Sequence, residues 1–175
     1  MTQYPSKKAG KIARLAVLTA MALAVQWLES LLPPPIPAVP VRIGLANIFV
    51  LYAMLEMTPG DALTVSVLRC LLLPLVTGNV SGFLYSLCGG VLSWMAMTAL
   101  LGTYRDSRIS SIGLSVAGAG AYQIGQVLAG CLIVGTVILA YVPVMMLLSI
   151  PAGIATGWIG GVLVSRISGK TGKQA

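Results

Sequence analysis

Long apolar stretches fill most of this chain, and nearly all of its charged residues lie between these stretches or near the two ends. Only 9% of the 175 residues are charged and 57% are hydrophobic, whereas about 25% of a soluble domain is charged. Because so few charges cannot cover a water-facing surface, most of the surface must face lipid. We therefore predict a single all-α integral membrane domain.

The apolar stretches correspond to six transmembrane helices in one bundle, since one helical crossing needs about 20 apolar residues. Turn residues separate them, and the proline-rich segment 33–42 is expected to form an extended cap outside the hydrocarbon. A rival arrangement keeps four spans and makes 43–77 a re-entrant hairpin entering from outside. The predicted divisions are tails at 1–11 and 167–175 and spans at about 12–32, 43–57, 61–76, 81–101, 112–135 and 144–166.

Nine of the eleven basic residues lie in three clusters along the chain. Cytoplasmic loops of membrane proteins carry an excess of Lys and Arg, and with six spans all three clusters fall on one side. We therefore predict a multi-pass protein of the inner (plasma) membrane with both termini in the cytoplasm. The net charge of +7 then indicates contact with membrane lipid and no nucleic-acid partner. The clusters are Lys7, Lys8, Lys11 and Arg14; Arg105 and Arg108; and Arg166, Lys170 and Lys173.

Residue types that carry catalytic chemistry are scarce. The chain has no His, and its two Asp residues, Asp61 and Asp106, lie far apart in predicted loops. No Gly-rich phosphate loop with a Lys–Ser/Thr pair is present, and the three Cys residues lack metal-ligand spacing. We therefore expect no enzyme activity, no metal site and no cofactor.

Polar side chains inside the predicted spans indicate a ligand site. A charge at the bilayer centre costs at least ~2.5 kcal/mol, and Arg69 lies near the middle of the third span. Most of the others fall in the outer halves, so we predict a pocket open to the outside with Arg69 as its floor. The alternative is structural: Arg69 pairs with Glu29 or bonds free carbonyls, and the amides join helices. The predicted ligand-binding residues are Trp27, Glu29, Asn47, Arg69, Tyr122, Gln123 and Gln126.

Small residues recur at four-residue spacing in three spans. Helices in lipid gain little from the hydrophobic effect, so close contact between them requires small side chains. We predict internal packing for the fifth and sixth spans, and for the first span either packing or docking of another membrane protein. The three ladders are Ala16, Ala20 and Ala24; Ala117, Ala121, Gly125 and Ala129; and Ser149, Gly153, Gly157, Gly161 and Ser165.

Several sequence blocks occur together in a fixed order and cover the chain from about Lys11 to Ser168. Through them the chain resembles the heptaprenyl diphosphate synthase component I family, also called the Gx transporter family. Many members have His-Asn where this chain has Tyr122-Gln123, which implies different ligand contacts there. The blocks are Arg42-Ile-Gly-Leu-Ala-Asn47-Ile, Val67-Leu-Arg69-Cys-Leu-Leu, Phe83-Leu-Tyr-Ser-Leu-Cys-Gly-Gly90-Val-Leu-Ser93, Gly113-Leu-Ser-Val-Ala-Gly and Gln123-Ile-Gly-Gln126.

The resemblance implies a fold similar to the S components of energy-coupling-factor transporters. These six-helix proteins bind vitamins or precursors near the outer face, and small residues of their first helix dock a coupling subunit driven by two ATPases. It implies that Ala16, Ala20 and Ala24 dock such a subunit, that the proline-rich segment covers the pocket, and that the ligand is a small vitamin-like or precursor molecule. The alternative function is a non-catalytic membrane partner in isoprenoid or quinone synthesis, because two separated Asp residues do not hold a Mg²⁺-bound diphosphate.

Overall fold

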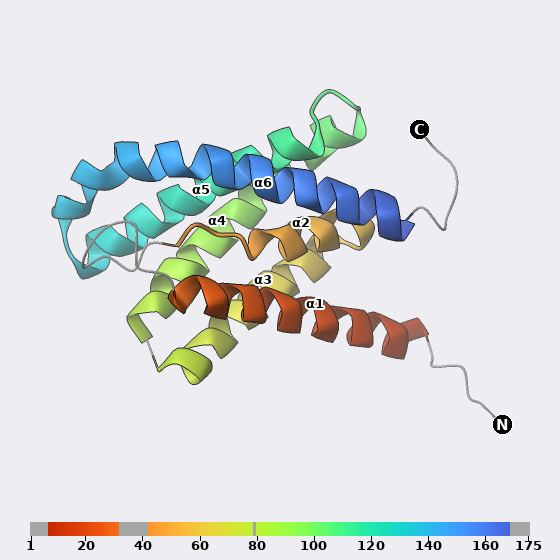
Figure 1. The fold of residues 1–175 in the computed structure, drawn as a ribbon, viewed down its shortest axis with the longest axis horizontal. Coiled ribbons are helices and arrows are strands. Elements are labelled where there is room, and N and C mark those ends of the chain that lie inside the picture. Colours follow the sequence, from red (N-terminus) through yellow and green to blue (C-terminus); the bar gives the residue numbers. More distant parts are fainter. Residues whose placement is uncertain (1–6, 32–41, 79, 169–175) are drawn as a thin grey trace.

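The computed structural model describes residues 7–31, 42–78 and 80–168. These residues form helices, with no strand among them, as predicted (Figure 1). The predicted proline-rich cap lies outside the described residues except for Arg42. The elements are α1 (Lys7–Leu31), α2 (Asn47–Glu56), α3 (Pro59–Thr77), α4 (Val80–Arg105), α5 (Ser111–Ile133), the 3₁₀ helix η1 (Thr136–Tyr141) and α6 (Val142–Ser168).

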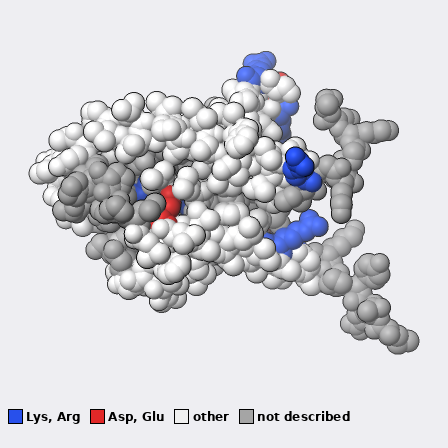
Figure 2. All heavy atoms as spheres, viewed as in Figure 1, with Lys and Arg blue, Asp and Glu red and all other residues white. Residues whose placement is uncertain are grey.

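Successive helices run back and forth along the bundle (Figure 1). The start of α1, the α2–α3 turn, the α4–α5 loop and the end of α6 lie toward one end. The end of α3, the start of α4 and the α5–η1 connection lie toward the other. Figure 2 shows Lys and Arg side chains gathered at the first end, which we call the basic end. The described parts of all three basic clusters therefore share one end of the bundle, as the charge pattern predicted.

Five helices in the described part of the chain are long and apolar enough to cross a membrane: α1, α3, α4, α5 and η1 together with α6. The remaining helix, α2, has only ten residues, about half the length of a full crossing. A membrane protein is thus indicated, and the count of six spans stays a prediction.

Only part of the second predicted span is helical, because α2 begins at Asn47. Gly44 has a φ of +88°, a left-handed conformation that favours glycine and interrupts a helix. From Asn47 onward α2 is central to the bundle, and seven of its residues are buried against its neighbours. Phe49, Leu51 and Met54 belong to the main apolar core, which also includes side chains of α3, α4 and α5. The short α2 is therefore a core helix that lies among the longer ones.

Glycines set the close contacts of α5 with α4 and α6. A Cβ at Gly125 would lie 2.5 Å from the Cys88 carbonyl oxygen of α4. A Cβ at Gly153 or Gly157 of α6 would lie 2.7 or 2.6 Å from a Cα atom of α5. The small-residue ladders of the fifth and sixth spans therefore pack helix against helix, as predicted.

The ladder on α1 behaves differently from the other two. Ala16, Ala20 and Ala24 are all exposed, and α1 buries its opposite face, including Ala22 and Gln26, inside the bundle. Within the described structure the α1 ladder is thus an open outer face, which we call the α1 alanine face.

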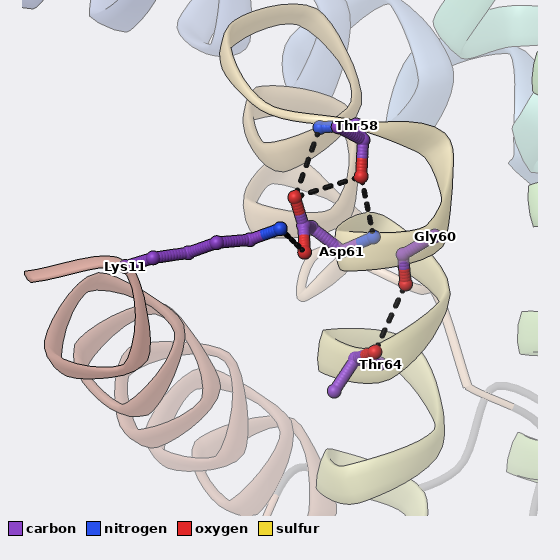
Figure 3. A network of polar contacts seen from close by, with 5 residues as sticks. All are labelled: Lys11, Thr58, Gly60, Asp61 and Thr64. Atoms are coloured by element: carbon purple, nitrogen blue, oxygen red, sulfur yellow. Dashed lines mark hydrogen bonds and ion pairs between the residues drawn. The ribbon is translucent and has the colours of Figure 1, made fainter. Parts of the chain in front are cut away.

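An ion pair fixes the start of α1 to the α2–α3 turn (Figure 3). The Nζ atom of Lys11 lies 2.8 Å from Oδ1 of Asp61. Asp61 also closes a capping box with Thr58, whose hydroxyl accepts from the Asp61 N–H while the Asp61 carboxylate accepts from the Thr58 N–H. The turn between α2 and α3 therefore lies beside the start of α1 at the basic end.

Asp61→Ala is expected to lower the free energy of unfolding by about 1–2 kcal/mol, because it removes a helix cap as well as the ion pair. Lys11→Met should cost less than about 1 kcal/mol, since the Lys11 side chain is 49% exposed. Thermal unfolding of the purified variants measures the difference. Equal losses in the two variants would mean that the cap contributes nothing.

Candidate functional site

Side chains of α1 and α5 bind the non-helical backbone that precedes α2. The Glu29 carboxylate accepts from the Leu45 N–H at 2.8 Å. The Gln126 amide accepts from the Arg42 N–H and donates to the Arg42 carbonyl, each at 3.1 Å, and Gln123 donates to the same carbonyl at 3.5 Å. Backbone that is not helical is tolerated at membrane depth only where its polar groups have partners inside the protein. These three side chains supply such partners for the stretch that interrupts the second span.

A second set of contacts joins the start of α2 to α3 and α4. Arg69 of α3 donates from Nη2 to Oδ1 of Asn47 at 2.7 Å. Asn47 in turn donates from Nδ2 to Oγ of Ser93 on α4 at 2.9 Å. Arg69 is only 1% exposed. The Asn47 amide therefore provides a hydrogen bond to a guanidinium group that lies deep within the bundle.

The Tyr122 ring packs against Gly44 and against Gly89 of α4. A Cβ added at Gly44 would lie 3.4 Å from the ring, and one added at Gly89 of α4 would lie 3.0 Å from it. The ring is therefore held between two positions that have no side chain of their own. We call Glu29, Arg42, Asn47, Arg69, Ser93, Tyr122, Gln123 and Gln126 the polar centre.

The ionised groups of the polar centre are close but not directly paired. Glu29 is within electrostatic reach of both Arg69 and Arg42. No direct ion pair joins Glu29 to either guanidinium group, although all three side chains are described. Arg69 thus pairs with neither Glu29 nor a backbone carbonyl among the described residues, and its hydrogen-bond partner is the Asn47 side-chain amide.

Several buried atoms of the polar centre have no hydrogen-bond partner in the described part of the chain. They are Nε and Nη1 of Arg69, Nη1 of Arg42 and Oε1 of Gln123. Leaving such an atom unpaired costs about 1–3 kcal/mol, and more when the group is charged. The large majority of buried polar side-chain atoms in proteins are paired. The polar centre thus has three unused donors, all on guanidinium groups, and one unused acceptor on Gln123.

Trp27 is a predicted site residue that the structure does not bring into the polar centre. Its side chain is 41% exposed, and it follows Ala20 by seven residues, which places both on one face of α1. The other six predicted residues do belong to the polar centre.

The sequence reasoning missed Arg42 and Ser93 of the polar centre, and also the completely buried Gln26. Gln26 precedes Glu29 by three residues, so a shared helix face was available as a signal. Ser93 carried no comparable signal, because a lone serine in an apolar helix usually bonds its own backbone.

A family model described as heptaprenyl diphosphate synthase component I matches residues 18–163. The chain belongs to this family. No curated protein and no solved structure matches the chain. The matched part of this heptaprenyl diphosphate synthase component I family member runs from α1 into α6, so it contains the entire polar centre.

Among the described residues no three His, Cys, Asp or Glu side chains come together in a way that would hold a metal ion. What the polar centre offers instead is a set of hydrogen-bond donors with two cationic groups, an arrangement suited to binding.

Proposed function

We propose that the chain is the membrane-embedded substrate-binding component of an uptake transporter of the energy-coupling-factor type. In this role it captures a small vitamin-like or precursor molecule outside and delivers it inward by association with a coupling transmembrane subunit and its ATPases. The observation that carries the proposal is the exposure of the α1 alanine face, which the rest of the bundle leaves uncovered.

The α1 alanine face suits a helix of another membrane protein. The matching ladders on α5 and α6 are used for contacts inside the bundle, whereas Ala16, Ala20 and Ala24 contact no neighbouring helix closely enough to be buried. In lipid the hydrophobic effect does not favour the association of apolar helix faces. Small residues nevertheless allow two helix backbones to approach each other and to gain packing contacts. The expected occupant is therefore a transmembrane helix of the coupling subunit.

The polar centre supports the ligand-binding half of the proposal. Glu29 lies near the end of α1 that is remote from the basic end, and Gln126 lies near the corresponding end of α5. If the basic end faces the cytoplasm, as its charges predict, the polar centre lies toward the outer half of the membrane. Polar residues inside a membrane domain mark substrate sites by default.

Ala20→Leu is expected to reduce recovery of a coupling subunit at least tenfold, because the added side chain keeps the two helices apart. The chain is purified in mild detergent from its native cells after crosslinking, and co-purified membrane proteins and ATPases are measured by mass spectrometry. Ala99→Leu is the matched control, since Ala99 is an exposed alanine on α4, and it should leave recovery unchanged. Absence of any coupling subunit or ATPase from the unmodified chain would reject the proposal.

A second candidate function is a non-catalytic membrane partner in heptaprenyl diphosphate synthesis. The family description favours it, and so does a shallow hollow of about 440 Å³ at the basic end. The hollow is lined by Tyr104, Arg105, Ser107, Arg108, Ile109 and Ser110, and its arginines suit an acidic soluble partner. Reconstitution of the soluble synthase with and without this chain tests the idea. Equal prenyl transfer in both preparations would remove it.

A further inference from the structure

The charges of the polar centre do not balance. Among its described side chains, Arg42 and Arg69 are basic and only Glu29 is acidic. Arg42 is 7% exposed and Arg69 is 1% exposed, so water does not solvate the excess positive charge. The other described acidic residues lie at the basic end: Glu56 is the last residue of α2, Asp61 is in the first turn of α3, and Asp106 is in the α4–α5 loop. One positive charge is therefore left without a counter-charge in the interior.

The excess charge coincides with the unpaired donors. Arg69 has two unpartnered nitrogens and Arg42 has one, within the described residues. A buried charge is normally paired, because an unpaired one loses its hydration without compensation. Both guanidinium groups interact electrostatically with Glu29 and with Tyr122. Their free donors therefore lie in the same part of the bundle.

The start of α2 adds to this positive region. Its first residue, Asn47, is the partner of Arg69, so the partial positive charge at the helix N-terminus lies at the same place. Interrupted transmembrane helices of transporters use such N-termini to bind anionic groups of substrates. Three independent sources of positive potential therefore meet at one site.

We propose that the polar centre binds an organic monoanion through its carboxylate, which accepts hydrogen bonds from the free nitrogens of Arg69 and Arg42. This inference rests on the proposed function in taking the polar centre as the ligand site. A carboxylate carries the single negative charge that the site lacks, whereas a phosphate group carries about −1.5 to −2 at neutral pH. Charged hydrogen bonds from guanidinium to carboxylate are among the strongest in proteins.

The test compares benzoate with benzamide, which have the same shape and differ in charge. The full chain is placed in lipid nanodiscs, and its unfolding temperature is followed as sodium benzoate replaces sodium chloride at constant ionic strength. Benzoate at ten times its dissociation constant should raise the unfolding temperature by roughly 3–6 °C, and benzamide should not. A shift by inorganic phosphate without one by benzoate would overturn the assignment to a carboxylate.

Arg69→Gln is expected to abolish the benzoate shift and to leave the ligand-free protein as stable as before or more stable. The reason is that the substitution leaves Arg42 and Glu29 as one cation and one anion. Arg108→Gln, at an exposed position of the α4–α5 loop, is the control and should keep the shift. An unchanged shift in Arg69→Gln, or no shift by benzoate in the unmodified chain, would refute the proposal.

The result of the benzoate test can be distinguished from the result of the test of the transporter proposal. If benzoate binds through Arg69 but no coupling subunit is recovered with the chain, the carboxylate site stands and the transport role falls. If a coupling subunit is recovered but benzoate does not bind, the transport role stands and the carboxylate site falls.

Discussion

Gly125→Ala is expected to destabilise the bundle severely, although it adds only one methyl group. The new Cβ would lie 2.5 Å from the Cys88 carbonyl oxygen, 2.6 Å from the Cys88 carbonyl carbon and 2.7 Å from the Gly89 Cα. All three atoms are backbone, so no side chain can rotate away and α4 must shift as a whole. Overpacking of this kind costs about 1–3 kcal/mol or more. Gly125→Leu should prevent recovery of folded protein.

Gly120→Ala is the matched control on the same helix. A Cβ at Gly120 would meet no described atom within 4 Å, and alanine stabilises a helix interior by roughly 0.5–1 kcal/mol relative to glycine. Thermal unfolding in detergent should therefore move in opposite directions for the two variants. If both variants lowered the unfolding temperature equally, the close contact of α4 and α5 would not be the cause.

Asn47→Leu is expected to be the most damaging single change in the polar centre. It removes the amide that accepts from Arg69 and donates to Ser93, and it leaves Arg69 buried without a described hydrogen-bond partner. Stranding a buried charge in this way costs about 3–5 kcal/mol. Most of the expressed chain should then aggregate on extraction, as size-exclusion chromatography would show.

Asn47→Asp has nearly the same shape as the unmodified residue, so it shows what an added negative charge beside Arg69 does without removing the hydrogen-bond acceptor. The carboxylate keeps an acceptor for Arg69, adds the missing negative charge, and can accept from the Ser93 hydroxyl, which is also a donor. This variant should therefore fold at least as well as the unmodified chain and should lose the benzoate shift. Equal instability of the Leu and Asp variants would contradict the charge argument.

The sequence predicted the helical bundle well because lipid imposes a simple requirement on composition. Long apolar stretches marked the parts of the chain that form α1, α3, α4, α5 and α6, and the boundaries of the membrane spans stay predictions. The non-helical backbone before Asn47 was not predicted, because hydropathy does not report the left-handed conformation of Gly44. The hydropathy pattern also did not indicate the 3₁₀ helix η1, because its apolar residues continue the pattern of the neighbouring helices.

The candidate site was predictable where a polar residue stood in an apolar helix. Glu29, Asn47, Arg69 and Gln126 were found in this way, and all of them lie in the polar centre. Arg42 was not found, because a cation at the edge of a loop looks solvated in the sequence, yet the structure buries it to 7% exposure. Their role in binding a ligand stays a prediction.

The proposed uptake role depends on the orientation of the bundle. The polar centre lies toward the outside only if the basic end faces the cytoplasm. Single cysteines replace Lys8, Ser107 and Thr136, which are exposed positions near the start of α1, in the α4–α5 loop and at the opposite end, in a chain whose three native cysteines are replaced by alanine. A membrane-impermeant thiol reagent applied to intact cells should label Thr136→Cys, and should label Lys8→Cys and Ser107→Cys only after permeabilisation. Labelling of Lys8→Cys or Ser107→Cys in intact cells would contradict the account.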